Sequence, residues 1–521
     1  MGGSFWRAAG LIALTATGWA TAPALALPAP TSGPASGSGV TGIAIAGTQD
    51  VGTFNGIAYS RIWGTVSGVV APNEKVEGLA AQPKDPQGNF AYTSPFEIIA
   101  PTKPGNNSTI LIESENRGTP IMHNYLDAIA ATGPAAKATY PKGLGNGFLE
   151  QHGISYGRVS WQTGISPGVP AKAEGVGEVI IRDFARFLGG DRSHLTNAAT
   201  PNLGHYTTRI FGGISQSSWF VNAFVAEGFN ADPKTGARVF GGVIAVDGTG
   251  NWLALNQLAA THKASQAPYV LEDAAPLQAH DILKRPKSDP LYIDIANYTD
   301  FYRVHASLTD TAKLPARMWR YDWPGPHHPV TSEKDATATF AATRPGGACN
   351  DGHVVPLNPI SYAPYLRTVV VELAHRLGSH DVRHAHALPP SVVFKLGPAP
   401  TDTAHLNPMQ GVTLKVPVVD HDANPVGGVR YPETAAPFGK PEPVSLPPVI
   451  TSAITGTCGN IGEWQPFTEA QLKQRYGDQA GFLERYGQAA DQLIKEGYLL
   501  ASEKAEMMAT AARHYMTPDK P

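Results

Sequence analysis

The stretch from Arg209 to Gly228 constrains the fold of this 521-residue chain most strongly. It begins as a short apolar run, turns within Gly213-Ile214-Ser215-Gln216-Ser217, and continues with apolar residues at helical spacing. Gly228 stands where helices commonly end in a left-handed residue. The pattern predicts a strand that passes through one tight turn into a helix. Such a turn lifts the Ser215 hydroxyl clear of the sheet, beside free amides at the positive end of the helix.

A serine on a strand-to-helix turn is the nucleophile elbow of α/β-hydrolases, whose pattern is Gly-x-Ser-x-Gly. The last position here is Ser217 instead of glycine. Many such pentapeptides are ordinary turns, but the preceding strand and the following helix supply the context that the motif requires. We therefore predict that Ser215 is a nucleophile and that the backbone N–H of Gln216 contributes to an oxyanion hole.

The composition indicates a globular protein and excludes several partners. Hydrophobic residues make up 42% of the chain and charged residues 16%, which excludes general disorder. The net charge is −3, and no basic stripe with interleaved aromatic residues is visible, so we predict no nucleic-acid partner. The length allows one large α/β unit or two domains. We predict a single catalytic domain over residues 40–515.

The first 26 residues have the pattern of a secretory signal peptide. Arg7 provides a positive start, Ala8 to Ala20 is apolar, and Ala24-Leu25-Ala26 fits a cleavage site. A membrane anchor is the weaker interpretation, because the apolar run is short and interrupted. We therefore predict export to the periplasm or the extracellular space, with no membrane span after cleavage. Residues 27–39 form a Pro/Ser/Gly-rich linker.

The two cysteines, Cys349 and Cys458, predict one disulfide in an oxidising compartment. It would close a loop of about 109 residues and stabilise the chain by about 4–5 kcal/mol in the chain-entropy model. The alternative is two buried free thiols. Four histidines gather near the end of a predicted helix, but no carboxylate or cysteine pattern supports a metal site there. They are His375, His380, His384 and His386. We predict neither a metal nor a cofactor.

Apolar runs predict a central sheet with antiparallel strands at the N-terminal end. The predicted strands are Thr41–Ala46, Ala58–Ser67, Ala91–Ile99, Ser108–Ser114, Gly153–Trp161, Val239–Val246, Leu291–Ala296 and Arg317–Trp323. Helices are predicted over Val176–Leu188 and Tyr365–Gly378, and in a C-terminal segment over residues 467–515, with a capping box at Thr468 to Gln471. Residues 251–290 are a candidate lid, and residues 389–448 a proline-rich wrap over the surface.

The strand Ser108–Ser114 runs directly into Asn116-Arg117-Gly118. In α/β-hydrolases, the loop after the third strand supplies one amide of the oxyanion hole. Arg117 or Gly118 is therefore the second candidate donor, together with Gln216. The alternative is an ordinary turn with Arg117 as a surface charge.

The order of Ser215, Asp300 and His328 along the chain is the order of the triad in α/β-hydrolases. Asp300 follows one predicted strand and His328 the next. A histidine would take the serine proton, and a carboxylate would hold the imidazole in the required tautomer. Asp247, which also follows a strand, is the alternative acid, and His327 is the alternative base.

Several segments together resemble one family, the bacterial secreted proteins known as "alpha/beta hydrolase domain" proteins. The elbow Gly-x-Ser-Gln-Ser is typical of that family. The other matching segments are Asn116–Gly118, Gly228–Asp232, Arg238–Ile244, Gly477-Asp478, Glu484–Tyr486 and Gly497–Leu500. The resemblance spans roughly residues 50–515 and implies an α/β-hydrolase fold with Ser215 as nucleophile.

The same resemblance implies a histidine in a Gly-x-x-His setting, which Gly325-Pro326-His327-His328 matches. Relatives often carry an acidic residue where this chain has Tyr298. That departure leaves Asp300 as the local acid and keeps Asp247 open. The family's substrates are largely undefined, so the resemblance implies a reaction class only.

We predict a secreted serine hydrolase that cleaves a small-molecule or polymer-derived carboxylic ester. If Arg117 faces the pocket, it would favour esters that carry a carboxylate. The alternatives are a non-catalytic binding protein on the same scaffold, or an amidase or acyltransferase of the same fold. The sequence does not indicate an oligomeric state.

Overall fold

The computed structural model describes ten ranges of the chain, all within one compact unit, Ala35–Pro521. They are residues 37–105, 107–128, 145–197, 200–256, 276–303, 305–325, 359–378, 387–399, 415–443 and 463–516.

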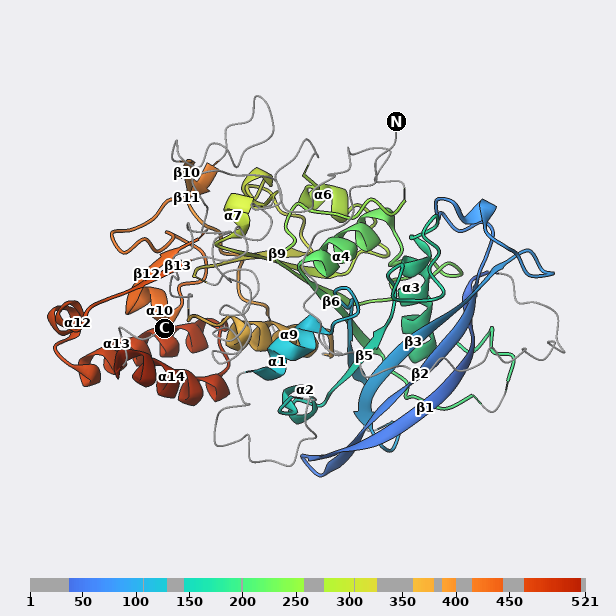
Figure 1. Ribbon diagram of the computed structural model, residues 1–521, viewed down its shortest axis with the longest axis horizontal. Helices are drawn as coiled ribbons and strands as arrows, with labels where there is room; N and C mark the ends of the chain where they lie inside the picture. The colour runs from blue at the N-terminus through green and yellow to red at the C-terminus, as the bar shows by residue number, and fades with distance from the viewer. Residues whose placement is uncertain are drawn as a thin grey trace, which may run out of the picture. The chain divides into compact units, whose positions relative to one another are not determined.

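A nine-stranded sheet forms the centre of the unit (Figure 1). Its strands are β1 (Gly39–Phe54), β2 (Ile57–Val70), β3 (Phe90–Pro101), β4 (Thr109–Glu113), β5 (Ile154–Val159), β6 (Thr208–Ile214), β7 (Gly242–Val246), β8 (Leu291–Asn297) and β9 (Met318–Trp323). The spatial order is β1-β2-β3-β5-β4-β6-β7-β8-β9. Strands β1, β2, β3 and β5 pair antiparallel, whereas the six strands from β5 to β9 in this order run parallel. This confirms the predicted fold class.

The N-terminal antiparallel strands are longer than the sequence predicted. β1 and β2 form a hairpin whose turn is Asn55-Gly56, both with positive φ (49° and 79°). This is the dipeptide that favours a two-residue hairpin turn. β1 contains three register irregularities, which lie near Thr41, Ala46 and Val51. Each irregularity breaks the alternation of apolar and polar residues, so periodicity alone revealed only a fragment of this strand.

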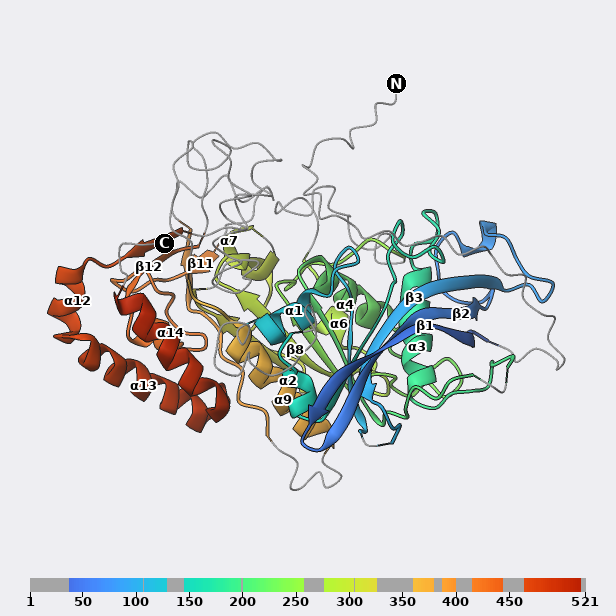
Figure 2. The ribbon, with the colours of Figure 1, turned by 60° about the horizontal axis from the view of Figure 1, so that its bottom comes forward.

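Helices cover both faces of the sheet (Figures 1 and 2). They are α1 (Ile121–Ala128), α2 (Phe148–Gln151), α3 (Val176–Leu188), α4 (Gln216–Glu227), α6 (Ala279–Ile282), α7 (Asp300–Arg303), α9 (Ala363–Gly378), α10 (Pro432–Ala435), α12 (Glu469–Tyr476), α13 (Gln479–Glu496) and α14 (Lys504–Met516). Short 3-10 helices occupy Leu79–Ala81, His305–Leu308 and Ala501–Glu503.

Alternate strand residues pack into two separate cores. Ile110, Phe211 and Val243 belong to one core with α3, α4 and α6. Their neighbours Leu111 and Ile210 belong to the other core with α1 and α9. This alternation follows from the pleat of the strands, and burial on both faces explains why the parallel strands are almost continuously apolar.

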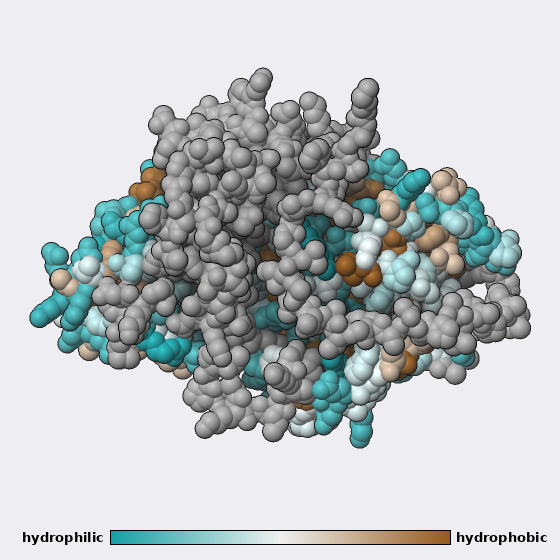
Figure 3. All heavy atoms as spheres, in the orientation of Figure 1, coloured by the Kyte–Doolittle hydropathy of each residue, from teal (hydrophilic) through white to brown (hydrophobic). Residues whose placement is uncertain are grey.

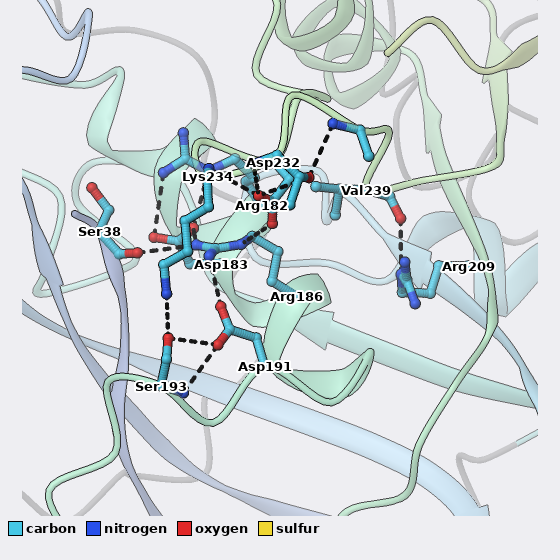
Figure 4. Close-up of polar contacts among 12 residues, drawn as sticks. Ser38, Arg182, Asp183, Arg186, Asp191, Ser193, Arg209, Asp232, Lys234 and Val239 are labelled. Carbon is cyan, nitrogen blue, oxygen red and sulfur yellow. Dashed lines mark hydrogen bonds and ion pairs between the residues drawn. The ribbon is translucent and has the colours of Figure 1, made fainter. Parts of the chain in front are cut away.

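A network of buried and half-buried charges attaches the start of β1 to α3 (Figure 4). The guanidinium of Arg182 binds both carboxylate oxygens of Glu74 (2.6 and 3.0 Å) and also contacts Asp183. Arg186 donates to Asp232 (2.8 Å) and to the backbone oxygen of Ser38 (3.0 Å). Since Arg182 and Arg186 are almost fully buried, their charges depend on these carboxylates.

The predicted helical C-terminal segment consists of three helices, because Gly477 (φ 78°) ends α12 and Gly497 (φ 84°) ends α13. The predicted capping box is confirmed: Thr468 and Gln471 bond each other's backbone amides at the start of α12. The helices dock against α9 through Glu433, whose carboxylate accepts the hydroxyls of Tyr486 (2.5 Å) and of Tyr365 on α9 (3.3 Å). Their outer surface is mainly hydrophilic (Figure 3).

The candidate lid and wrap are only partly described. Residues 257–275 lie outside the described residues, whereas Leu277, Ile282 and Leu283 are buried in the core beside α4. The wrap contains three short strands, and a fourth pairs with one of them from beyond it. These are β10 (Leu396–Pro398) with β11 (Lys415–Pro417), and β12 (Gly439–Glu442) with β13 (Glu463–Pro466). The predicted signal peptide, the predicted linker as far as residue 36, Cys349 and Cys458 also lie outside the described residues.

Candidate active site

Ser215 occupies the one-residue turn between β6 and α4, as the sequence predicted. Its backbone angles are φ 62° and ψ −130°, a conformation that non-glycine residues rarely adopt. β6 stays paired with β7 as far as Ile214, and α4 begins at Gln216, so a single residue must reverse the chain. The strain at Ser215 is of the kind that concentrates at functional sites.

Glycine is required at Gly213 because the strand and the helix approach closely. A Cβ atom there would lie 2.6 Å from the backbone oxygen of Ser217. The fifth position tolerates serine because the Ser217 side chain forms part of the turn. Its buried hydroxyl accepts a hydrogen bond from the Ile214 amide (2.9 Å) and donates to the Ile214 carbonyl (2.7 Å). Ser217 therefore ties the first turn of α4 back to β6.

The loop after β4 forms a tight turn whose central residues, Arg117 (φ 49°) and Gly118 (φ 83°), both have positive φ. Its two internal hydrogen bonds, each 2.9 Å, use the amides of Asn116 and Thr119. Within the described ranges, no hydrogen bond uses the amide of Gly118 or that of Gln216. Gly118 therefore stays a candidate donor in this loop, and the turn itself does not rank it against Arg117.

The loop is attached directly to the elbow. The side-chain amide of Asn116 donates to the carbonyl of Ile214 (3.1 Å), and the Ser114 amide donates to the carbonyl of Gly212 (2.7 Å). These contacts bring the Gly118 turn to the start of α4. An ordinary surface turn would not have these hydrogen bonds to the elbow.

Arg117 is exposed, and its guanidinium donates to the side-chain oxygen of Asn116 (3.0 Å). Ile165 lies beside the same turn, because a Cβ atom on Gly118 would be 3.2 Å from it. Ile165 is 43% exposed. The cationic side chain of this loop and the neighbouring apolar side chain of Ile165 therefore both face solvent near the elbow.

Both candidate acids lie at the same edge of the sheet as Ser215. The Ser215 amide donates to the carbonyl of Val246 (2.9 Å), and the next residue, Asp247, has positive φ (58°) and is fully buried. Asp300 is the first residue of α7 and is also fully buried. The structure brings the two carboxylates to adjacent strand ends and does not separate their roles.

Asn297, the last residue of β8, contacts both aspartates. Its side-chain amide donates to Asp247, and its backbone amide donates to Asp300 (2.9 Å). Tyr362 is near the same pair: burial raises the pKa of its hydroxyl, and the charges of Asp247 and Asp300 raise it further. Asn297 was not among the residues predicted for the site, although its position directly after an apolar run was a usable signal.

The candidate bases, His327 and His328, lie outside the described residues, which resume at Pro359. β9 ends at Trp323, and Gly325 is the last described residue before the two histidines. The histidine of the predicted triad therefore stays a prediction. β9 does lie next to β8 in the sheet, as the predicted order of acid and base requires.

Glu113 is the second residue that the sequence analysis missed. It is a fully buried carboxylate at the end of the apolar strand β4, at the base of the loop that carries Gly118. Its position after three apolar residues was the available signal, because a charged residue at the end of a buried strand needs partners.

The rest of the described chain adds no metal site and no membrane span. No group of three histidine, cysteine or carboxylate side chains in these ranges is arranged to hold a metal ion. None of the helices described combines the length and apolar composition needed to cross a bilayer. A cleft of about 820 Å³ opens at the C-terminal end of α4, the end away from Ser215, and charged residues of both signs line it.

Comparison with known proteins identifies a family. A family model described as "Alpha/beta hydrolase domain" matches residues 142–509, well over half of the chain. No curated protein is similar enough to match the chain.

Similar solved structures include three hydrolases, each 12% identical to this chain. XC6422 from Xanthomonas campestris, an a/b serine hydrolase without lid, has a TM-score of 0.20, and the match covers 44% of this chain and 71% of XC6422. The carboxylesterase Est55 from Geobacillus stearothermophilus has a TM-score of 0.18, covering 30% and 29%. A CE15 glucuronoyl esterase from Teredinibacter turnerae has a TM-score of 0.21, covering 40% and 46%. The chain thus spans less than half of the last two proteins, and these low scores carry no argument about substrate.

Proposed function

Because the chain belongs to the alpha/beta hydrolase domain family, we propose that it is a serine hydrolase that cleaves carboxylic esters through an acyl-enzyme. The observation that carries the proposal is the backbone of Ser215, held at φ 62° between β6 and the first turn of α4. This conformation exposes a serine hydroxyl beside helix amides, which is the arrangement that a nucleophile needs.

In the proposed reaction, the Ser215 hydroxyl oxygen attacks the ester carbonyl carbon and its proton passes to His328. The amides of Gln216 and Gly118 stabilise the negative charge on the carbonyl oxygen. The ester C–O bond breaks, and the alcohol leaves with the proton from His328. Water then attacks the acyl-enzyme, its proton passes through His328 to the serine oxygen, and the carboxylic acid is released.

The test of the nucleophile is fluorophosphonate labelling of the purified protein, with turnover of p-nitrophenyl esters of increasing acyl length. We expect labelling and turnover in the wild type, and loss of both in Ser215→Ala. A folded wild type that neither labels nor turns over would refute the proposal and favour a binding role. Product analysis with added alcohols and with amides separates an esterase from an acyltransferase or an amidase.

The acid and the base are separated by paired variants. We propose Asp300 as the acid, since it follows β8 while the proposed base follows β9. Asp300→Asn should lower kcat about 10⁴-fold, whereas Asp247→Asn should retain more activity. His328→Ala and His327→Ala form the matching pair for the base. The reverse ranking in either pair would reassign that role.

Two further proposals concern substrate and location. Arg117 is exposed near the elbow, which supports a preference for esters that carry a carboxylate. Equal selectivity of wild type and Arg117→Ala between charged and neutral esters would exclude this role. Residues 1–26 support export, which amino-terminal sequencing of the protein from the periplasm or the culture medium would test.

A further inference from the structure

The carboxylate of Glu113 is buried at the base of the loop that carries the candidate oxyanion-hole amide. The side chain is fully buried and accepts three hydrogen bonds. The amide of Met122 donates to one oxygen (2.7 Å), and the amide of His123 (3.0 Å) and the hydroxyl of Tyr156 (2.8 Å) donate to the other. All three partners donate, which is the pattern that suits an ionised carboxylate.

These hydrogen bonds join the two ends of the loop. Glu113 is the last residue of β4, whereas Met122 and His123 are the second and third residues of α1. A serine, threonine or aspartate directly before a helix usually caps these amides, but Pro120 stands there and cannot. Glu113 supplies the cap from across the loop, and its negative charge also lies at the positive end of α1.

The middle of the loop is attached to the elbow. Asn116 holds the carbonyl of Ile214, and the ring nitrogen of Trp161 donates to the Glu115 carbonyl (2.9 Å). Glu113 holds the far end of the loop, where α1 begins. In the sequence, Gly118 lies between Asn116 and the two α1 residues that Glu113 binds, Met122 and His123. If the contact at Glu113 loosens, the Gly118 amide can move relative to the amide of Gln216, and an oxyanion hole depends on that spacing.

We propose that Glu113 is a positioning residue, whose ionised carboxylate clamps the loop from Ser114 to Pro120 and so keeps the Gly118 amide in register with the Gln216 amide. The proposal rests on the proposed function. Glu113 itself does not touch the substrate, because its side chain is fully buried.

The surroundings of Glu113 make the clamp sensitive to pH. Burial raises the pKa of Glu113 to about 7, although its three hydrogen bonds favour the charged form. The titratable groups that face it are Tyr156 on β5 and His123 on α1, whose rings stack with centroids 4.3 Å apart. Arg158, further along β5, is paired with Glu115 (2.7 Å). Protonation of the Glu113 carboxylate below pH 7 would add an O–H donor at a group toward which three donors already point.

The chain offers a matched control for removing this charge. Glu433 is also a buried carboxylate, burial also raises its pKa, and it also accepts tyrosine hydroxyls, from Tyr365 and Tyr486. It is the second residue of α10 and lies in the contact between α9 and the C-terminal helices. Glu113→Gln and Glu433→Gln therefore remove similar charges from similar surroundings.

The experiment measures kcat and KM for p-nitrophenyl acetate, and the rate of fluorophosphonate labelling, on the full-length protein at pH 8. Values are normalised to the fraction of molecules that label at saturation. We expect Glu113→Gln to lower kcat about tenfold with KM unchanged within about twofold, because the glutamine NH₂ group would face a helix amide. Labelling should slow by the same factor. Glu433→Gln should leave both rates within about twofold of the wild type.

The pH profile supplies a readout that a structural role would not change. In the wild type, the acid limb of kcat/KM should fall with a slope above one, since the base and Glu113 both titrate there. In Glu113→Gln the slope should return to one. Tyr156→Phe, which keeps the carboxylate, should retain the steep limb with a smaller loss of kcat, and it serves if Glu113→Gln does not fold.

The failures of the two proposals are distinguishable. A wild type that neither labels nor turns over would overturn the proposed function, and this proposal with it. A reactive wild type whose Glu113→Gln variant keeps its normalised kcat and its steep acid limb would overturn the clamp alone. Equal losses of kcat in Glu113→Gln and Glu433→Gln would also overturn it.

Discussion

Replacement of Gly213 by alanine tests whether the packing of the elbow sets the position of the nucleophile. The added Cβ atom would lie 2.6 Å from the backbone oxygen of Ser217 and 2.9 Å from the backbone nitrogen of Ser218. Ordinary contact begins near 3.4 Å, so the strand and the helix must separate by about 0.8 Å. Neither neighbour can yield by rotating a side chain, because both contacts are to backbone.

A displacement of this size at a reacting group costs about 10²-fold in rate. We therefore expect Gly213→Ala to lower kcat/KM for p-nitrophenyl acetate about 30- to 100-fold and to slow fluorophosphonate labelling in parallel. The overpacking should also lower the free energy of unfolding by about 1–3 kcal/mol. Circular dichroism and the labelled fraction at saturation separate loss of folded protein from loss of rate.

The preceding residue provides the control. A Cβ atom on Gly212 would lie 2.6 Å from the sulfur of Met122, which is the flexible end of a side chain. Gly212→Ala adds the same atom one residue away, and the methionine can rotate to make room, so we expect less than about a threefold loss of kcat/KM. Wild-type activity in Gly213→Ala, or an equal loss of kcat/KM in the two variants, would refute this prediction.

Three further predictions concern stability, each measured by denaturant unfolding. Ser217→Ala should cost about 1–3 kcal/mol, because the buried Ile214 amide loses its partner; an unchanged midpoint would contradict this. Arg320→Met should cost about 3–5 kcal/mol, because it leaves the buried carboxylates of Asp294 and Asp322 without their cation. Burial raises the pKa of both, so the cost should shrink at pH 5, and an equal cost at pH 5 and 8 would contradict it. The pKa of Glu113 is raised to about 7, so its stabilising contribution is complete below about pH 4.5 and is lost as the pH rises through about 7. Relative to Glu113→Gln, the free energy of unfolding of the wild type should fall by about 3 kcal/mol between these pH values. A rise in this free energy would contradict the prediction.

Local patterns predicted the parts of the fold that depend on local chemistry. The elbow, the helix that ends at Gly228 and the capping box at Thr468 each combine a few adjacent residues, and the structure contains all three. The length of β1 was not predictable in this way, because its pairing with β2 imposes an extended conformation on a sequence without regular alternation.

The candidate site was predictable where position along the chain carried the information. Ser215, Gly118 and Gln216 could be proposed from the sequence because each stands at a defined place after a strand. The contacts of Glu113 and Asn297 were not, because their partners are distant in the sequence or depend on the exact pairing of strand ends. The choice between Asp247 and Asp300 stayed open for the same reason, since parallel strands bring both carboxylates to one edge.

The docking of the C-terminal helices determines when the core on the α9 face can close during synthesis. The core on the α9 face contains Leu111 and Ile210 from the sheet together with Leu493, Met507 and Ala511 from the last helices. A chain synthesised from its N-terminus cannot close this core until Ala511 has emerged. The newly made protein therefore carries an uncovered apolar surface until that point, and a premature stop that removes α14 would leave part of that surface permanently open.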